Sequence, residues 1–271
     1  MKNNTKDKIA NVIMGMGSTV GSVASGMTTL ALPGVEGILV ATLANGIIVK
    51  VFKDMGHRIL SERENKKIIE SCAYSIEKIN DNIQENKKLR DDDFFNNNGE
   101  NRSNVEEIFE GVLFSAQKEH EEKKLKYYGY LFANIAFDET VSKSFANQLI
   151  SISNRLTYRQ LQIIAMYTYS SKKSNFFKDG KLPKLDNIDK ISIVQDTVEL
   201  YRMGILNGGG EIILEMGYVN PYKIGVEPIG ICLFKLMNLE EIIKEDYRDI
   251  DNMVILLNNL EHIPSNNNLK A

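Results

Sequence analysis

The chain has 271 residues, of which 25% are charged and 43% hydrophobic, and its formal net charge is −3. This length leaves room for two modest domains or for one domain with an appendage, and the apolar fraction is typical of a protein with a real core. Because the net charge is small, a chain-wide attraction to nucleic acid or anionic lipid is excluded, and such binding would need a local patch.

The first fifty residues contain a long stretch that is almost free of charge. Glu36 is the only charged residue between Lys8 and Lys50. As a helix, residues 9–32 would be about 36 Å long, enough to cross a hydrocarbon core of about 30 Å. Pro33 and Gly34 would then form a turn, and residues 35–52 would return as a second helix of about 27 Å. This pattern predicts a membrane-active helical hairpin, and it is too long for a signal peptide.

Basic residues flank both open ends of this hairpin. Lys2, Lys6 and Lys8 precede it, and Lys50, Lys53 and Arg58 follow. The positive-inside rule then places both ends in the cytoplasm and the turn outside. We therefore expect a protein of the bacterial inner membrane, with the bulk of the chain in the cytoplasm.

Small residues recur every four positions in the first segment, where they form two adjacent tracks. These tracks are Gly17, Gly21 and Ser25, and Ser18, Ser22 and Gly26. Such a face lets helix backbones approach closely in a bilayer, as in a glycine zipper. Its hydroxyl groups could line a pore only if several copies assembled, so this interpretation requires a homo-oligomer. Two alternatives remain open: a hairpin buried in a soluble bundle or oligomer core, and a disordered or cleaved segment.

Residues 58–90 are highly charged, with apolar residues in a 3-4 spacing at Ile69, Cys72, Ile76, Ile79 and Ile83. Two heptads of this kind fit a short coiled-coil stalk below the membrane, or one amphipathic helix that packs on its own domain. Residues 91–104 form a polar loop, and Asp91, Asp92 and Asp93 in it are interpreted as a solvated charge run without a metal.

Three helices should follow and form the core of a cytoplasmic bundle. One covers about 105–136 and is capped by Ser103 and Glu106, and another covers about 140–154. A third begins after the capping pair Thr157 and Gln160 and extends toward residue 170.

Residues 170–187 form a basic loop that also contains aromatic side chains. Basic residues interleaved with aromatics can hold a phosphate backbone and stack a base, which makes a nucleotide or oligonucleotide a candidate ligand. The alternative is a solvated loop anchored by two phenylalanines. The candidate ligand-binding residues are Lys172, Lys173, Phe176, Phe177, Lys178 and Lys181.

The C-terminal region has the order helix, hairpin, helix that is typical of a winged-helix tail. A helix over about 189–203 ends at Gly204, and a turn at Gly208–Gly210 separates short apolar runs that include residues 211–216 and 223–228. Helices over about 228–237 and 239–260 follow. Because arginines are missing from the position of a recognition helix, a packing role is favoured and no duplex DNA is expected.

The predicted fold class is therefore mostly α. It has a membrane hairpin in residues 1–57, a helical stalk and bundle in 58–170, and a winged-helix-like region with a small β-hairpin in 188–263. The three histidines, His57, His120 and His262, lie in unrelated contexts, and no catalytic motif is present. The chain lacks a Cys-x-x-Cys pair or a Cys/His cluster, so we expect neither an enzyme nor a cofactor or metal.

The stretches that carry a resemblance are residues 123–167 (KKLKYYGYLFANIAFDETVSKSFANQLISISNRLTYRQLQIIAMY) and 198–242. They resemble helical proteins of bacterial anti-phage defence, and among these the Hailong type. In that type a membrane-channel effector is held inactive by a nucleotide-based signal. The resemblance covers about half of the chain. It implies a membrane channel that depolarises the cell and arrests growth, and a soluble ligand whose binding residues it does not assign.

Overall fold

The structure is a computed structural model that describes residues 60–96, 99, 102–170, 176–177 and 182–259. Within these ranges the fold is mostly helical, with nine α-helices and one two-stranded antiparallel sheet, which confirms the mostly α class. The predicted hairpin of residues 9–52 lies outside them. Of the helices in the described ranges, none combines the length and the apolar character needed to cross a bilayer.

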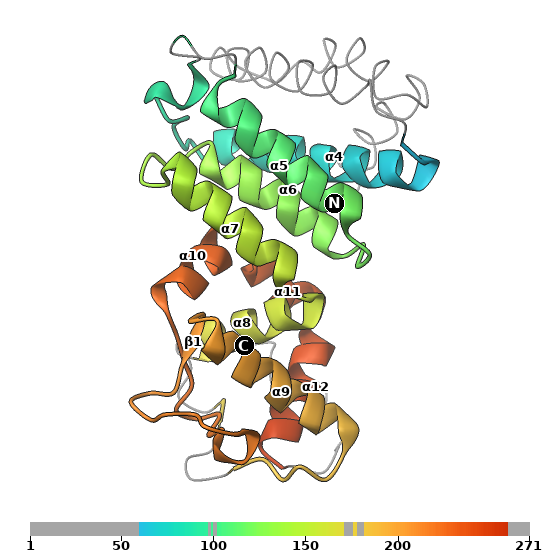
Figure 1. The fold of residues 1–271 in the computed structure, drawn as a ribbon, viewed down its shortest axis with the longest axis vertical. Coiled ribbons are helices and arrows are strands. Elements are labelled where there is room, and N and C mark those ends of the chain that lie inside the picture. Colours follow the sequence, from blue (N-terminus) through green and yellow to red (C-terminus); the bar gives the residue numbers. More distant parts are fainter. Residues whose placement is uncertain (1–59, 97–98, 100–101, 171–175, 178–181, 260–271) are drawn as a thin grey trace. The chain divides into compact units, whose positions relative to one another are not determined.

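The chain divides into two compact units, which are described separately (Figure 1). Unit 1 ends at Arg155 and unit 2 begins at Leu156. The predicted stalk and bundle, residues 58–170, span this boundary, because the helix that begins at Tyr158 packs against helices of unit 2.

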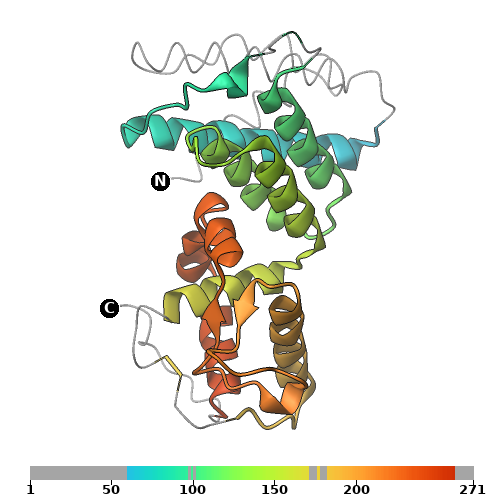
Figure 2. The ribbon, with the colours of Figure 1, turned by 60° about the vertical axis from the view of Figure 1, so that its left-hand side comes forward.

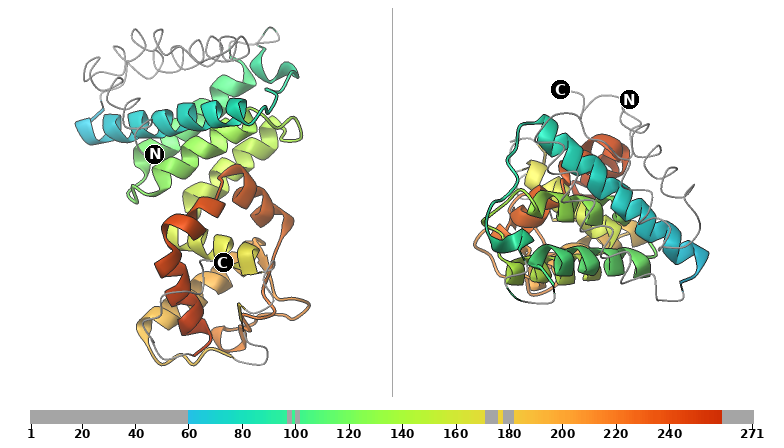
Figure 3. Two further views of the ribbon diagram at one scale, coloured as in Figure 1. Left: turned by 180° about the vertical axis from the view of Figure 1, so that it is seen from behind. Right: turned by 90° about the horizontal axis from the view of Figure 1, so that it is seen from above.

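Between residues 60 and 155, the described part of unit 1 has four α-helices and one short 3-10 helix around a shared apolar core. The long helix α4 packs mainly on α6 and also on α5, and α5 packs on α6, α7 and the 3-10 helix η2. Figure 3 shows α4, in blue to blue-green, crossing the green helices. The elements are α4 (Glu62–Gln84), η2 (Asp93–Phe95), α5 (Asn104–Lys118), α6 (Lys124–Ile135) and α7 (Lys143–Arg155).

The apolar seam of α4 faces the interior of unit 1. Four of its five predicted members are buried, and Ile83 is half-buried. Of the two arrangements that the heptad spacing allows, the structure therefore has the amphipathic helix that packs on its own unit. The buried members are Ile69, Cys72, Ile76 and Ile79.

Gly129 brings α4 and α6 close together. A Cβ atom at this position would lie 2.6 Å from the carbonyl oxygen of Ser71 and 2.8 Å from the Cβ of Tyr74. Real Cβ atoms essentially never approach backbone so closely, so only glycine fits. The backbones of the two helices consequently meet without side chains between them.

The predicted helix over residues 105–136 is wrong in one respect, since the structure has two helices there. The capping pair of Ser103 and Glu106 is confirmed at the start of α5, where the Glu106 carboxylate accepts from the Ser103 amide at 3.2 Å. Helix α5 ends at Lys118, and Glu119 has extended backbone angles (φ −66°, ψ 135°). Helix α6 then begins at Lys124.

Unit 2 is built around α8, which contacts α9, α10, α11, α12 and strand β2. The predicted capping pair at its start is confirmed, because the Thr157 amide donates to Gln160 Oε1 at 3.1 Å and the Gln160 amide donates to Thr157 Oγ1 at 3.2 Å. Figure 2 shows the two short strands beside α9. The helices are α8 (Tyr158–Ser170), α9 (Ile188–Arg202), α10 (Pro228–Leu236), α11 (Glu240–Glu245) and α12 (Tyr247–Leu257).

The predicted end of the helix before Gly204 is confirmed. Gly204 has φ +69°, the left-handed conformation that glycine adopts readily. Its amide donates to the carbonyl of Tyr201, and the amide of Ile205 donates to that of Leu200, both at 2.9 Å. These two bonds form a Schellman motif that closes α9.

The hairpin region differs from the prediction. Strand β1 (Leu206–Asn207) pairs with β2 (Gly225–Val226), and the predicted strand-like run 211–216 is not part of this sheet. The turn at Gly208–Gly210 is present, with the Glu211 amide donating to the Gly208 carbonyl at 3.1 Å. Beyond it, Ile212 is 75% exposed, so the apolar character of this run does not indicate a buried strand.

The last predicted helix, residues 239–260, is also wrong as a single element. Asp246 separates α11 from α12 with φ −110° and ψ 33°. Its carboxylate accepts a hydrogen bond from the Tyr158 hydroxyl at 2.5 Å and one from Gln162 Nε2 at 3.3 Å. These bonds tie the break to α8.

Replacing Gly129 with alanine should destabilise unit 1. The added Cβ overpacks the contact of α4 with α6, at a cost of about 1–3 kcal/mol that outweighs the gain in helix propensity. The matched control is Gly111→Ala in α5, whose Cβ would lie 3.5 Å from Ile150 Cδ1 and should stabilise the helix by up to about 1 kcal/mol. Urea unfolding of the full chain measures both. Equal stability of the two variants would contradict the close contact.

Candidate functional site

The candidate residues of the N-terminal hairpin lie outside the described part of the chain. They are Gly17, Ser18, Gly21, Ser22, Ser25, Gly26, Pro33 and Gly34. The same holds for four lysines of the basic loop, Lys172, Lys173, Lys178 and Lys181. Their roles stay predictions.

The two phenylalanines of the basic loop contact tyrosines of α8. The Phe177 ring lies 5.4 Å from the Tyr167 ring and is 6% exposed, and the Phe176 ring lies 6.0 Å from that of Tyr169. The carbonyl of Phe176 also accepts from Asn258 Nδ2 at 3.1 Å. Both rings are therefore engaged within unit 2, and a base could stack on Phe177 only if that ring left its position.

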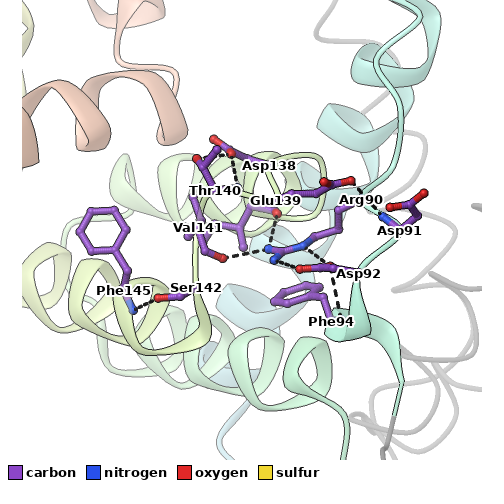
Figure 4. Close-up of polar contacts among 11 residues, drawn as sticks. Arg90, Asp91, Asp92, Phe94, Asp138, Glu139, Thr140, Val141, Ser142 and Phe145 are labelled. Carbon is purple, nitrogen blue, oxygen red and sulfur yellow. Dashed lines mark hydrogen bonds and ion pairs between the residues drawn. The ribbon is translucent and has the colours of Figure 1, made fainter.

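A buried arginine joins two loops of unit 1 (Figure 4). The guanidinium group of Arg90 donates from Nε to Asp92 Oδ1 at 2.8 Å and from Nη2 to Asp92 Oδ2 at 2.5 Å. Its Nη1 donates to the carbonyls of Val141 at 3.0 Å and Ile135 at 3.3 Å. The ring of Phe94 lies beneath, 4.1 Å from Cζ. One side chain thus holds the segment after α4 against the segment after α6.

This network changes the interpretation of the acidic run at residues 91–93. Hydrogen bonds from Arg90 hold the pKa of Asp92 below its usual value. Asp92 also accepts from the Phe94 amide at 3.4 Å and caps η2. The middle acid of the run is therefore exposed, as the sequence predicted, and it is also the partner of a buried cation.

An ion pair whose two partners are both buried lies between α5 and α6. Oε1 of Glu119 accepts from the amides of His120 at 2.8 Å and Glu121 at 3.0 Å. Its Oε2 accepts from the Tyr128 hydroxyl at 2.9 Å and forms an ion pair with Lys124. The side chains of Glu119 and Lys124 are only 5% and 2% exposed. This carboxylate therefore fixes the turn into α6.

Burial and ion pairing shift the pKa of Glu119 in opposite directions. Burial alone raises its pKa, but the hydrogen bond and charge of Lys124, together with the Glu121 amide and Tyr128, outweigh that effect and lower it. For Tyr128, burial and the adjacent carboxylate both raise the hydroxyl pKa. At neutral pH Glu119 is thus a carboxylate and Tyr128 a neutral phenol.

Glu119, His120 and Glu121 form the one group in the described ranges whose ligand atoms lie close enough to share a metal ion. The two oxygens of Glu119, however, together already accept from four donors, two on each oxygen. A metal would have to displace Lys124, which would leave a buried ammonium without its partner. The geometry therefore fits a structural ion pair better than a metal centre.

Sequence reasoning missed both networks. One signal for the Glu119 cluster was available, because the apolar stripe of the predicted helix jumps from Ala116 to Leu125 across a charged run. Such a gap is typical of a helix boundary. No comparable signal marks Arg90, whose acceptors include two backbone carbonyls from a segment far along the chain.

The start of α4 is tied to the end of α5. Glu64 accepts from Gln117 Nε2 at 2.9 Å and from the amide and hydroxyl of Ser61 at 2.8 and 2.7 Å. The hydrogen bond from Gln117 has the largest effect, and together these bonds lower the pKa of Glu64 to about 2. The first turn of α4, which follows the uncharged N-terminal stretch, is therefore held by unit 1.

Comparison with known proteins gives no relative for this chain: it matches no family model, no curated protein and no solved structure. A functional proposal must therefore be based on the sequence and on the contacts above.

Replacing Glu119 with glutamine should destabilise unit 1 by about 3–5 kcal/mol, because Lys124 would remain buried without its carboxylate. The control Glu122→Gln removes an exposed partner 3.6 Å from Arg63 and should cost at most about 1 kcal/mol. Urea unfolding at neutral pH measures both. Similar losses in the two variants would contradict the role of the buried pair.

Acid should reproduce the effect of the Glu119 substitution. The pKa of Glu119 lies below the ordinary value of about 4.3, so its stabilisation is complete above that value and is lost as the pH falls through the folded-state pKa. Over that pH range the wild type should lose more stability than Glu119→Gln.

Replacing Arg90 with lysine should cost roughly 1–3 kcal/mol, because the three N–H groups of an ammonium lie on one nitrogen and cannot replace the four hydrogen bonds that the guanidinium makes from three nitrogens. The control Arg63→Lys changes a side chain that is 70% exposed and should change the stability by less than about 0.5 kcal/mol. Thermal unfolding of the full chain compares them, and an unchanged melting temperature for Arg90→Lys would contradict the network's role.

Proposed function

We propose that the protein is a homo-oligomeric membrane effector. Its N-terminal residues 9–52 act on the bilayer as a channel or pore, and the rest of the chain controls them. The observation that carries the proposal is the charge pattern: Glu36 alone is charged between Lys8 and Lys50, and lysines flank both sides. Few soluble segments of this length contain so few charged residues, whereas a hairpin that spans a membrane requires an almost uncharged sequence.

The character of the first segment favours a channel over a passive anchor. Two tracks of small residues allow helices to approach closely, and the hydroxyl groups among them can face water. A passive anchor would have no use for either property and would be richer in leucine. A pore of this kind needs several copies, so the partners are the bilayer and the chain itself.

Helix α4 is the element best suited to connect the two parts. It begins at Glu62, ten residues after the second apolar segment, and it packs along α6. The bonds of Glu64 to Gln117 and Ser61 hold its first turn. A change in unit 1 would therefore be passed along α4 to Glu62, ten residues from the end of the second apolar segment.

The resemblance to Hailong-type effectors suggests the biological context. In that context, opening of the channel depolarises the inner membrane and arrests growth during phage infection. The ligand in that setting is a nucleotide or oligonucleotide. On the same proposal, unit 2 with its winged-helix-like order acts through packing rather than by binding duplex DNA.

Membrane attachment tests the proposal first. Membranes from cells that express the full chain are washed with alkaline carbonate, and the protein should stay in the pellet. Release into the supernatant would favour the alternative, a soluble helical module with a buried hairpin, and would overturn the proposal.

Pore formation is tested with a potential-sensitive dye in cells that express the full chain. Gly21→Leu fills the small-residue face and should abolish depolarisation while far-UV circular dichroism stays unchanged. Val23→Leu is the matched control, since at 100° per residue it lies on the opposite side of the helix and should depolarise like the wild type. Equal depolarisation by both variants would contradict the proposed face.

A further inference from the structure

One short segment of unit 2 has the side-chain pattern of a strand but pairs with no strand of the described ranges. Residues 212–214 lie between bends at Glu211 and Glu215 and belong to none of the helices or strands given above. Ile212 and Leu214 are 75% and 76% exposed, whereas Ile213 between them is 6% exposed. This alternation is typical of a strand with one buried face. Ile213 thus anchors the segment on unit 2, and its two neighbours reach solvent.

The backbone of this segment is also unpaired. Within the described part of the chain, the amides and carbonyls of Ile212, Ile213 and Leu214 form no hydrogen bond. Because backbone groups that are buried without a partner are rare, these groups are in contact with water. Unpaired backbone groups beside exposed apolar side chains are the features of a strand edge that accepts another strand.

A second strand suits this segment better than a lipid surface does. In hydrocarbon the unpaired amides and carbonyls would lose their water and gain no partner, whereas a strand would supply one. The segment is also flanked by two carboxylates, Glu211 and Glu215, and one lysine, Lys223, pairs with Glu211. This local charge does not favour an anionic membrane.

The sequence of the segment is complementary to itself. Read in either direction, residues 211–215 (EIILE) run from a carboxylate through three apolar side chains to a carboxylate. In an antiparallel pair centred on Ile213, Ile212 of each copy would lie opposite Leu214 of the other, with Cβ atoms about 5 Å apart. Two identical apolar pairs result, as the symmetry of an interface between like surfaces requires.

The same register places Glu211 of one copy opposite Glu215 of the other. Like charges in directly opposite positions destabilise a strand pair. Lys223 already forms an ion pair with Glu211, so each of the two carboxylate pairs has a cation beside it. The charges therefore limit the strength of the contact without preventing it.

We propose that residues 211–215 form an interface between two copies of this chain, in which the segments pair as antiparallel strands centred on Ile213. The pairing gives the backbone groups hydrogen-bond partners and covers Ile212 and Leu214, the two most exposed large hydrophobic side chains of the described ranges. Five residues from each copy are far fewer than the roughly 20–30 on each side of a stable interface. The contact therefore joins copies that are already held together, and in this respect it rests on the proposed homo-oligomer.

Disulfide formation tests the register in the full chain, in a background where the half-buried Cys232 is replaced by serine and the buried Cys72 is kept. Two differently tagged copies, one with Ile212→Cys and one with Leu214→Cys, are co-expressed, purified through both tags and oxidised. They should form at least about tenfold more disulfide dimer than two copies of either variant, because a disulfide needs Cβ atoms about 4 Å apart and identical positions lie farther apart in this register. The matched control combines Ile212→Cys with Tyr218→Cys, a 60% exposed position outside the segment, and should give no such excess.

The two tags separate this proposal from the oligomer on which it rests. Co-purification without an excess of the disulfide between positions 212 and 214 overturns the interface and leaves the proposed oligomer standing. Failure of the two copies to co-purify overturns both.

A fluorescent reporter tests contact with lipid. The chain contains no tryptophan, so Leu214→Trp places a single one in the segment. In vesicles of brominated phosphatidylcholine, the fluorescence of the reconstituted full chain should be quenched little, because the second copy and not the bilayer covers this position. Strong quenching would assign the segment to the lipid surface and overturn the proposal.

Discussion

Helices α4 and α6 meet backbone to backbone at Gly129, and the rest of unit 1 is arranged around that contact. Because a Cβ would collide with the Ser71 carbonyl, the contact fixes how deeply α4 sits on α6. The apolar seam of α4 is thereby used within the unit, and α5 and α7 complete the core on α6 and on each other.

Two ion pairs, Glu119 with Lys124 and the buried Arg90 with the exposed Asp92, secure the ends of α6 rather than its middle. Glu119 holds the turn that leads into the helix, and Arg90 holds the carbonyls that follow it. Each pair is satisfied by several hydrogen bonds, which is the condition under which buried charges are tolerated. Helix α6 is therefore fixed at both ends and at Gly129. A ligand or a change of charge that acts on α6 would be passed to α4, and so toward the N-terminal stretch.

Local signals in the sequence predicted helix starts and one helix end correctly. The capping pairs at Ser103 and Thr157 and the glycine at 204 depend on a few adjacent residues, so their chemistry is visible in the sequence. The break at Asp246 was missed because a distant partner, Tyr158, stabilises it, whereas the break at Glu119 was marked by the gap in the apolar stripe between Ala116 and Leu125. The heptad spacing could not distinguish a stalk from a packed helix, because both bury the same stripe. Of the candidate sites, the basic loop was visible in the sequence from its composition.

Hydrogen exchange of the backbone amides in the full chain tests the central claim most directly, that α4 is a packed part of unit 1 and not a free stalk. If the account is correct, amides between Ile68 and Ile79 should exchange as slowly as those between Leu125 and Ile135, because both helices open only when the unit unfolds. Exchange of the α4 amides that is faster by orders of magnitude, while α6 remains protected, would contradict it.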